Sequence, residues 1–267
     1  MEPQQGVILA LSSGGVRGFA HVGVLKVLDR YRVPIAGIAG SSMGGLIGGL
    51  YCAGYTGSMI QDVALNVRRS DWIDFSLSKM GLVAGKKLEA LLAQWTHGCQ
   101  FEDCSPPLKV VAVDIETGAP VLIETGSLAA GIRATVSIPG VFSPVVRNGK
   151  ILVDGGVLNR VPVDVARLFG DCPVIAVDVG VELAPTVGSM FDVLFQTFDL
   201  MAYQLKQYRP VEADLMIAPR LQLTREAHFS KIPEVIQAGE VATEQVISKI
   251  VELIHKDGTA AKGGASH

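Results

Sequence analysis

The sequence predicts an α/β fold: a three-layer sandwich in which a central, mostly parallel β-sheet carries helices on both faces. Short apolar segments alternate along the chain with longer segments whose apolar residues recur at helical spacing, which is typical of strands alternating with helices. The segments 109–115 (KVVAVDI) and 173–179 (PVIAVDV) are largely apolar without a period of two, as expected of strands buried on both faces. The 267 residues, 49% of them hydrophobic, can bury one large core. We therefore expect one domain over residues 1–257 and a disordered polar tail over 258–267.

Turn-forming and helix-ending residues mark the limits of the expected elements. The residues 116–118 (ETG) should join two strands into a hairpin. A helix over 127–137 should end before Pro139, because the residue before a proline disfavours the helical conformation. A helix over 164–169 should be closed by Gly170. The expected strands are 6–12, 35–39, 109–115, 120–124, 151–153, 173–179 and 214–218, and the expected helices are 19–31, 43–53, 88–95, 127–137, 164–169, 187–207 and 233–253.

The composition excludes several classes of function. The net charge of −3 and the pI of about 6.0 leave no basic excess to neutralise phosphates, so we expect no nucleic-acid partner. The four cysteines form no CxxC pair and lack histidines at zinc-ligand spacing, so we expect no metal and no other cofactor. Free thiols and the lack of a signal-peptide pattern at the start favour a cytoplasmic protein. None of these patterns indicates an oligomeric state.

An uncharged segment, residues 33–60, has two interpretations. Its length would allow a transmembrane helix, and Gly40, Gly44 and Gly48 repeat at the spacing found where membrane helices dimerise. Glycine at this density is nevertheless costly in an isolated helix. A buried strand, a sharp turn and a buried helix explain the same residues better, so we reject the membrane span.

The sharp turn in this segment carries the strongest sign of chemistry. Gly40-Ser41-Ser42-Met43-Gly44 is a G-x-S-x-G motif between an apolar strand and a helix, the context in which the motif is meaningful. Its glycines let strand and helix approach closely, and the strained turn presents the serine hydroxyl at a helix N-terminus. We therefore expect Ser42 to be a nucleophile. The alternative is a glycine-rich turn without chemistry.

A second glycine-rich turn, residues 13–18 (SGGVRG), follows the first expected strand. Its consecutive glycines expose backbone N–H groups that can bind an anion. A dinucleotide site would need an acidic residue about 20 residues further on, but the chain carries the G-x-S-x-G turn there. Ser13 also stands where the first glycine of G-x-G-x-x-G would be. An oxyanion hole facing Ser42 fits the segment better than a dinucleotide.

The third motif is Asp154-Gly155-Gly156, directly after a short expected strand. The two glycines would let the aspartate approach another loop closely, although Asp-Gly is also a common turn sequence. A serine nucleophile normally recruits a histidine, and His228 follows Asp154 in a segment expected to be a loop. The residues alone leave open a triad with His228 and a Ser–Asp dyad that needs no histidine.

In combination, these three motifs resemble the patatin-like phospholipase family, whose members carry a G-G-G-x-R-G loop, a G-x-S-x-G turn and a D-G-[GA] aspartate. Similarity continues through residues 17–25, 112–118, 137–144 and 152–159, so that it covers roughly residues 6–253. The compact length is similar to bacterial single-domain members. The resemblance implies a patatin-like fold.

The resemblance also implies a role for each motif. Ser42 would attack an ester carbonyl, and Asp154 would accept its proton. The N–H groups of Gly14 and Gly15 would hold the oxyanion, and Arg17 would stabilise it or bind a lipid phosphate. The glycines expected to support these motifs are Gly40, Gly44, Gly155 and Gly156.

His21 and Ser13 also belong to the similar segments, and we expect a different role for each. His21 matches a position that is often histidine in bacterial members, and we expect it to be structural. Ser13 replaces the glycine that most members carry, which would cause strain only if its φ angle were positive. The two glycines that should present the N–H donors are intact.

The expected function is hydrolysis of the carboxylic esters of lipids, either phospholipids or other acyl esters, through an acyl-enzyme. Since aspartate has a reference pKa of about 3.9, we expect burial to raise the pKa of Asp154 so that it can act as a base. One alternative is a thioesterase or acyltransferase that uses the same dyad. Another is a regulatory, partner-binding protein that retains the fold with little turnover.

The expected partner is thus a lipid or ester substrate, and we also expect peripheral contact with a membrane. Residues 71–82, with Trp72, Phe75 and Leu82, could flank an acyl groove or touch a bilayer. The alternative is that these apolar residues cap the core.

Overall fold

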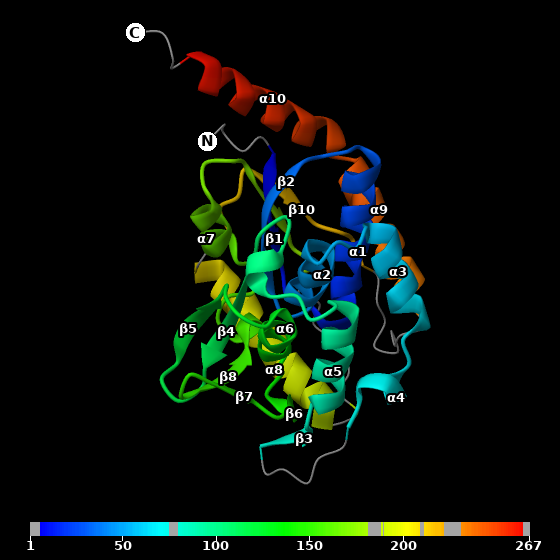
Figure 1. Cartoon of the computed structure of the whole chain (residues 1–267), viewed down its shortest axis with the longest axis vertical. Helices are drawn as coiled ribbons and strands as arrows, with labels where there is room; N and C mark the ends of the chain where they lie inside the picture. The colour runs from blue at the N-terminus through cyan, green and yellow to red at the C-terminus, as the bar shows by residue number, and fades with distance from the viewer. Residues whose placement is uncertain are drawn as a thin grey trace.

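A computed structural model of the chain describes residues 6–74, 80–180, 188, 190–208, 211–221 and 231–263. Its centre is an eight-stranded sheet (Figure 1). The strands of this sheet are β1 (Val7–Leu11), β2 (Ile35–Ser41), β4 (Leu108–Asp114), β5 (Ala119–Ile123), β7 (Val145–Arg147), β8 (Lys150–Asp154), β9 (Val174–Val177) and β10 (Leu215–Ile217). They lie in the order β10-β9-β1-β2-β4-β8-β7, with β5 paired to β4. The strands from β10 to β4 run parallel, whereas β5, β7 and β8 pair antiparallel with their neighbours.

Helices and a small second sheet complete the structure. The helices are α1 (Ala20–Arg30), α2 (Met43–Cys52), α3 (Gly57–Asn66), α4 (Arg69–Trp72), α5 (Lys86–Trp95), α6 (Leu128–Thr135), α7 (Val163–Ala166), α8 (Met190–Tyr208), α9 (Ile232–Glu244) and α10 (Ile247–Gly263). The 3₁₀-helices are η1 (Gly15–Phe19), η2 (Phe101–Asp103), η3 (Gly155–Val157) and η4 (Arg167–Phe169). Two short strands, β3 (Gly81–Val83) and β6 (Gly140–Phe142), pair with each other in parallel.

The sheet is buried on both faces, as the unbroken apolar strands predict. In β1, Leu9 and Leu11 join a large core that includes residues of α1, α2 and α9, whereas Ile8 and Ala10 join a smaller core with residues of α7. Neighbouring side chains of a strand point to opposite faces, so each face has its own apolar layer. The predicted sandwich with a mostly parallel sheet is therefore confirmed.

Most of the predicted elements lie within a few residues of their expected positions, including the hairpin formed by β4 and β5. The helix predicted over 233–253 is instead two helices, because α9 ends at Glu244 and α10 begins at Ile247. The hydroxyl of Thr243, in the last turn of α9, donates to the carbonyl of Gly239, and such bonding four residues back often bends a helix. Helix α10 continues past residue 257, where the sequence predicts the tail to begin, up to Gly263.

The uncharged segment 33–60 forms β2, α2 and the start of α3. Helix α3 was not predicted, although Thr56 caps it by accepting a hydrogen bond from the N–H of Met59, as a threonine at this position commonly does. Within the described ranges, no helix has the length and hydropathy needed to cross a membrane.

Candidate active site

The register of β4 brings two distant segments to one point. β2 pairs with the first part of β4, where Ser41 lies opposite Val111, and β8 pairs with the second part, where Asp154 lies opposite Ala112. Because β5 pairs with β4 over both parts, β2 and β8 must share its other edge. Ser42, which follows Ser41, therefore lies next to the end of β8.

Ser42 lies in a strained turn at this junction. Its φ and ψ angles are 51° and −120°, a conformation that side-chain-bearing residues rarely adopt. A Cβ on Gly40 would lie 2.5 Å from the Cα of Gly45, and a Cβ on Gly44 would lie 2.2 Å from the carbonyl oxygen of Leu11. Both glycines of the motif are thus required by backbone packing.

A hydrogen-bond chain orients the turn from behind. The backbone N–H of Ser42 donates to Oγ1 of Thr135 over 2.9 Å. The Thr135 hydroxyl in turn donates to the carbonyl of Val111 over 2.5 Å. This threonine, at the end of α6, therefore ties the serine turn to β4, although no sequence motif marks it.

The hydroxyl of Ser42 donates to Oδ2 of Asp154 over 2.5 Å, and Oδ1 of Asp154 accepts the N–H of Gly156 over 2.7 Å. Both Ser42 and Asp154 are buried. Burial raises the pKa of Asp154 to about 6, against the opposing effects of the bonds from Ser42 and Gly156 and of the charge of Arg160. A Cβ on Gly155 would lie 2.3 Å from the carbonyl oxygen of Val111, so this glycine lets the aspartate turn sit against β4.

The glycine-rich turn after β1 lies beside this pair. Gly15 has a φ of 54°, which glycine adopts without strain. Ser13 is absent from the non-glycine residues with positive φ, so the serine at this position causes no backbone strain. A Cβ on Gly156 would lie 2.5 Å from Oγ of Ser13, which places Ser13 directly against the aspartate motif.

The histidines contribute nothing to this arrangement within the described part of the chain. Nε2 of His21 bonds with the carbonyl of Ser12 over 2.8 Å in the core, and burial lowers the pKa of His21 to about 4. His228 lies outside the described residues. Among the described side chains, no cluster of three or more metal-ligating groups occurs.

Comparison with known proteins decides the family. The profile of the family described as Patatin-like phospholipase matches residues 9–167, more than half of the chain. The chain belongs to the patatin-like phospholipase family. An NTE family protein of Mycobacterium tuberculosis is 35% identical over 187 residues, which are 67% of this chain and 51% of that protein. Patatin-like phospholipase domain-containing protein 6 of Homo sapiens is 32% identical over 182 residues, 65% of this chain and 13% of that protein.

Solved structures agree on the fold of this patatin-like phospholipase family member. VipD from Legionella pneumophila superposes with a TM-score of 0.64 at 12% identity, covering 92% of this chain and 67% of VipD. The type III effector protein ExoU gives a TM-score of 0.50 at 12% identity, covering 94% of this chain and 53% of the effector. The chain spans about half the length of the mycobacterial relatives it matches.

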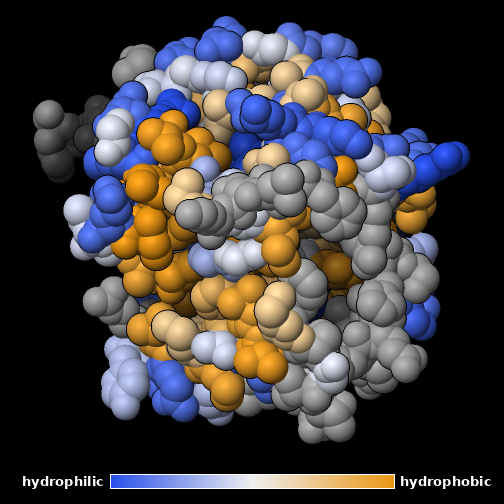
Figure 2. Space-filling model, turned by 90° about the horizontal axis from the view of Figure 1, so that it is seen from below, coloured by the Kyte–Doolittle hydropathy of each residue, from blue (hydrophilic) through white to orange (hydrophobic). Residues whose placement is uncertain are grey.

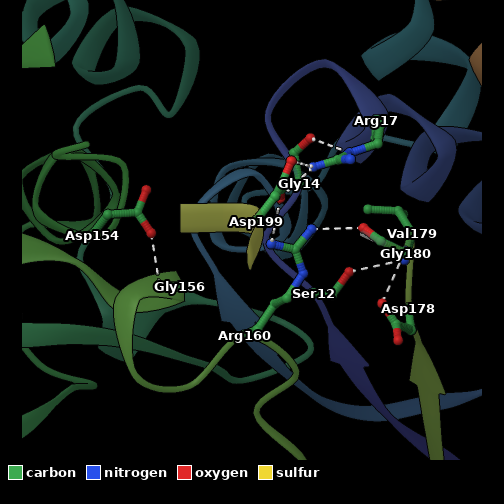
Figure 3. A network of polar contacts seen from close by, with 10 residues as sticks. All are labelled: Ser12, Gly14, Arg17, Asp154, Gly156, Arg160, Asp178, Val179, Gly180 and Asp199. Carbon is green, nitrogen blue, oxygen red and sulfur yellow. Dashed lines mark hydrogen bonds and ion pairs between the residues drawn. The ribbon is translucent and has the colours of Figure 1, made fainter. Parts of the chain in front are cut away.

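In this family member, the arginine of the glycine-rich turn is held by α8. Nη2 of Arg17 donates to both carboxylate oxygens of Asp199, over 2.9 and 3.0 Å. Arg160 approaches the same carboxylate at 3.5 Å and donates to the carbonyl of Gly180 over 2.7 Å (Figure 3). The charge of Arg17 is thus paired with Asp199 in this structure, and its expected role toward an oxyanion or a lipid phosphate stays a prediction.

The apolar residues expected to meet lipid are only partly described. Leu82 lies in β3 and is exposed, and the backbone of Trp72 belongs to α4. The side chain of Trp72 and the whole of Phe75 lie outside what the structure describes.

Proposed function

We propose that this chain is a serine acyl hydrolase that cleaves carboxylic esters of lipids with Ser42 as nucleophile and Asp154 as base. The observation that carries the proposal is the 2.5 Å hydrogen bond from the Ser42 hydroxyl to the buried Asp154 carboxylate. A carboxylate with a pKa of about 6 is largely ionised at neutral pH, yet accepts a proton more readily than an ordinary aspartate. Family membership supports a lipid substrate.

The proposed reaction proceeds in two halves. Asp154 accepts the hydroxyl proton as the oxygen of Ser42 attacks the ester carbonyl, and the same proton then passes to the departing alcohol. The resulting acyl-enzyme is cleaved by a water molecule whose proton Asp154 accepts and returns to Ser42. Water thus supplies the new oxygen of the free acid.

The N–H groups of Gly14 and Gly15 would hold the negative oxygen of the intermediate. Among the described residues, none accepts a hydrogen bond from either amide, so both can donate to a substrate. Losing one such donor typically costs about 10²–10³ in turnover. The side chain of Arg17 supports the glycine-rich turn, since its Nε lies 3.4 Å from the carbonyl oxygen of Gly14.

The decisive experiment is a panel of p-nitrophenyl esters and phospholipid vesicles with the wild type, Ser42→Ala, Asp154→Asn and His228→Ala. We expect the first two variants to lose hydrolysis and His228→Ala to keep most of it. If His228→Ala is as inactive as Ser42→Ala, a triad replaces the dyad. Activity that survives in Ser42→Ala would overturn the proposal.

The alternatives formulated from the sequence have separate tests. Transfer of the acyl group to an added alcohol, in place of hydrolysis, would identify an acyltransferase, and preference for acyl thioesters would identify a thioesterase. A regulatory protein without turnover would leave Ser42 unlabelled by a fluorophosphonate, which reacts with activated serines. We expect labelling in the wild type and none in Ser42→Ala.

A further inference from the structure

Helix α8 has its polarity reversed relative to an ordinary surface helix. Its sequence holds three charged residues, and the structure describes the side chains of two, Asp199 and Lys206. Both are held by ion pairs: Asp199, 15% exposed, pairs with Arg17 and Arg160, whereas Lys206, itself 48% exposed, reaches the buried Asp178. Residues seven apart lie on the same face of a helix, so the charged face of α8 is the inner one.

The opposite face of α8 is apolar and open to solvent. Met201 lies two residues, or about 200°, around the helix from Asp199. A helix normally turns its apolar stripe to the core and its charges to water, and contiguous exposed apolar surface marks a site of interaction. The large apolar side chains exposed on this face are Met190, Val193, Leu200, Met201, Leu205 and Tyr208. Phe195 and Tyr203 are exposed as well, but each is four residues from Asp199 and so flanks the charged face.

This surface is continuous with the small second sheet. Leu194 lies against Gly140 of β6, and β6 pairs with β3, where Leu82 is exposed next to Met80. Seen from below, this end of the molecule shows a broad hydrophobic area (Figure 2). Hereafter, Met190, Val193, Leu200, Met201, Leu205 and Tyr208 of α8, together with Met80 and Leu82, are called the apolar face.

Helix α8, which carries most of the apolar face, lies at the same end of the sheet as Ser42 and Asp154. Through Asp199, α8 contacts Arg17, which belongs to the glycine-rich turn, and Arg160, which follows the aspartate motif. Helix α8 thus spans the two segments that carry the proposed oxyanion hole and base.

We propose that the apolar face is the surface by which the protein docks on a lipid layer, with α8 lying along the interface. This inference rests on the proposed function, since a lipid hydrolase must meet an aggregated substrate. The basic side chains that contact α8, Arg17 and Arg160, are both paired with Asp199, and the carboxylates of Asp178 and Asp154 also act on Arg160. Docking therefore relies on buried apolar area, which is insensitive to salt, and not on attraction to anionic headgroups.

The test compares two double variants on vesicles of phosphatidylcholine, which carry no net charge. Val193→Glu with Met201→Glu changes the apolar face at positions 55% and 50% exposed, and the matched control, Leu168→Glu with Val241→Glu, changes positions 63% and 46% exposed elsewhere. We expect the first variant to lose about tenfold or more of the vesicle-bound fraction in flotation. The control should bind as the wild type does, and raising NaCl from about 0.1 to 0.5 M should change nothing.

Hydrolysis of a dissolved short-chain p-nitrophenyl ester separates docking from chemistry. All variants should keep this activity within about twofold, because surface substitutions seldom disturb a fold, while hydrolysis of vesicle lipid falls only in Val193→Glu with Met201→Glu. Wild type that does not float, or equal losses in both double variants, would overturn the inference. A wild-type dimer that the first variant converts to a monomer would assign the face to a second copy. Vesicle binding without hydrolysis of any ester would defeat the proposed function and leave the docking surface standing.

Discussion

Oγ1 of Thr135 lies 2.9 Å from the backbone nitrogen of Ser42 and accepts its N–H, while its own hydrogen is donated to the carbonyl of Val111. The buried hydroxyl thus satisfies one donor and one acceptor of the backbone at once. Thr135→Val keeps the shape of the side chain and removes both bonds. An unsatisfied buried polar group costs about 1–3 kcal/mol, and here the cost falls on the turn that presents the nucleophile.

We therefore expect Thr135→Val to lower kcat/KM for a dissolved ester by about tenfold to a hundredfold. Thr135→Ser retains the hydroxyl and serves as the control, with activity near that of the wild type. Rates of fluorophosphonate labelling at Ser42 should follow the same order. Equal activity in all three proteins would show that the orientation of the turn does not depend on this bond.

The pKa of Asp154 sets the expected acid limb of activity. A base must be ionised to accept a proton, and burial raises the pKa of this carboxyl to about 6. Below that pH, kcat/KM should fall about tenfold per pH unit. The measurement is a pH–rate profile with a dissolved ester, checked for reversibility by returning samples to neutral pH. A limb near the reference aspartate value of about 4 would mean that another group limits the rate.

The same raised pKa predicts a stability cost for the ionised carboxylate. The folded pKa of Asp154, about 6, lies above the ordinary aspartate value of about 3.9, so the stability due to the protonated form is complete below about pH 4 and is lost as the pH rises through about 6. The shift corresponds to about 3 kcal/mol. Asp154→Asn should therefore be more stable than the wild type at pH 7–8, by up to about that amount.

Urea unfolding at a series of pH values measures this difference. The advantage of Asp154→Asn should shrink as the pH falls from about 7 to about 4, because the wild-type carboxyl then becomes neutral as well. Ser42→Ala, which removes the hydroxyl and keeps the carboxylate, is the control and should retain the pH dependence. A difference that does not vary with pH would contradict a raised pKa.

Ser13 and Gly156 should be energetically coupled. A Cβ on Gly156 would lie 2.5 Å from Oγ and 2.8 Å from Cβ of Ser13, so Gly156→Ala forces an overlap that costs about 1–3 kcal/mol. Ser13→Gly removes both atoms and should recover part of this loss. A double-mutant cycle by urea unfolding should give a coupling of at least about 0.5 kcal/mol. Additive effects would show that the overlap is relieved in some other way.

The sequence located the parts of the candidate site that short motifs and strand–turn–helix context reveal. Ser42 stands between β2 and α2, and Asp154 ends β8, as their flanking glycines and apolar runs predict. The sequence did not predict Thr135, Arg160 and Asp199 as site residues, because their importance lies in contacts between segments that are far apart in the chain. Nothing local distinguishes such a threonine or aspartate from any other residue of a helix.

The elements of the fold were also predicted only where a local pattern in the sequence reveals them. Long apolar strands were recognisable because burial on both faces leaves a continuous hydrophobic run. The strands β3, β6 and β7 have three residues each, and a glycine or an arginine interrupts the apolar run in each of them. The equally short β10 was predicted because its residues, Leu-Met-Ile, are all apolar. The break between α9 and α10 was missed because no proline or glycine marks it and the helical pattern continues on both sides.

Because β2 and β8 adjoin one edge of β4, main-chain pairing sets the separation of Ser42 from Asp154. Insertions between these two positions could lengthen any intervening loop without moving the pair, provided that Val111 and Ala112 keep their partners. A slip of β8 by a single residue would instead turn the carboxylate to the opposite side of the sheet. The chemistry of this chain is thus tolerant of changes in length and intolerant of changes in strand alignment.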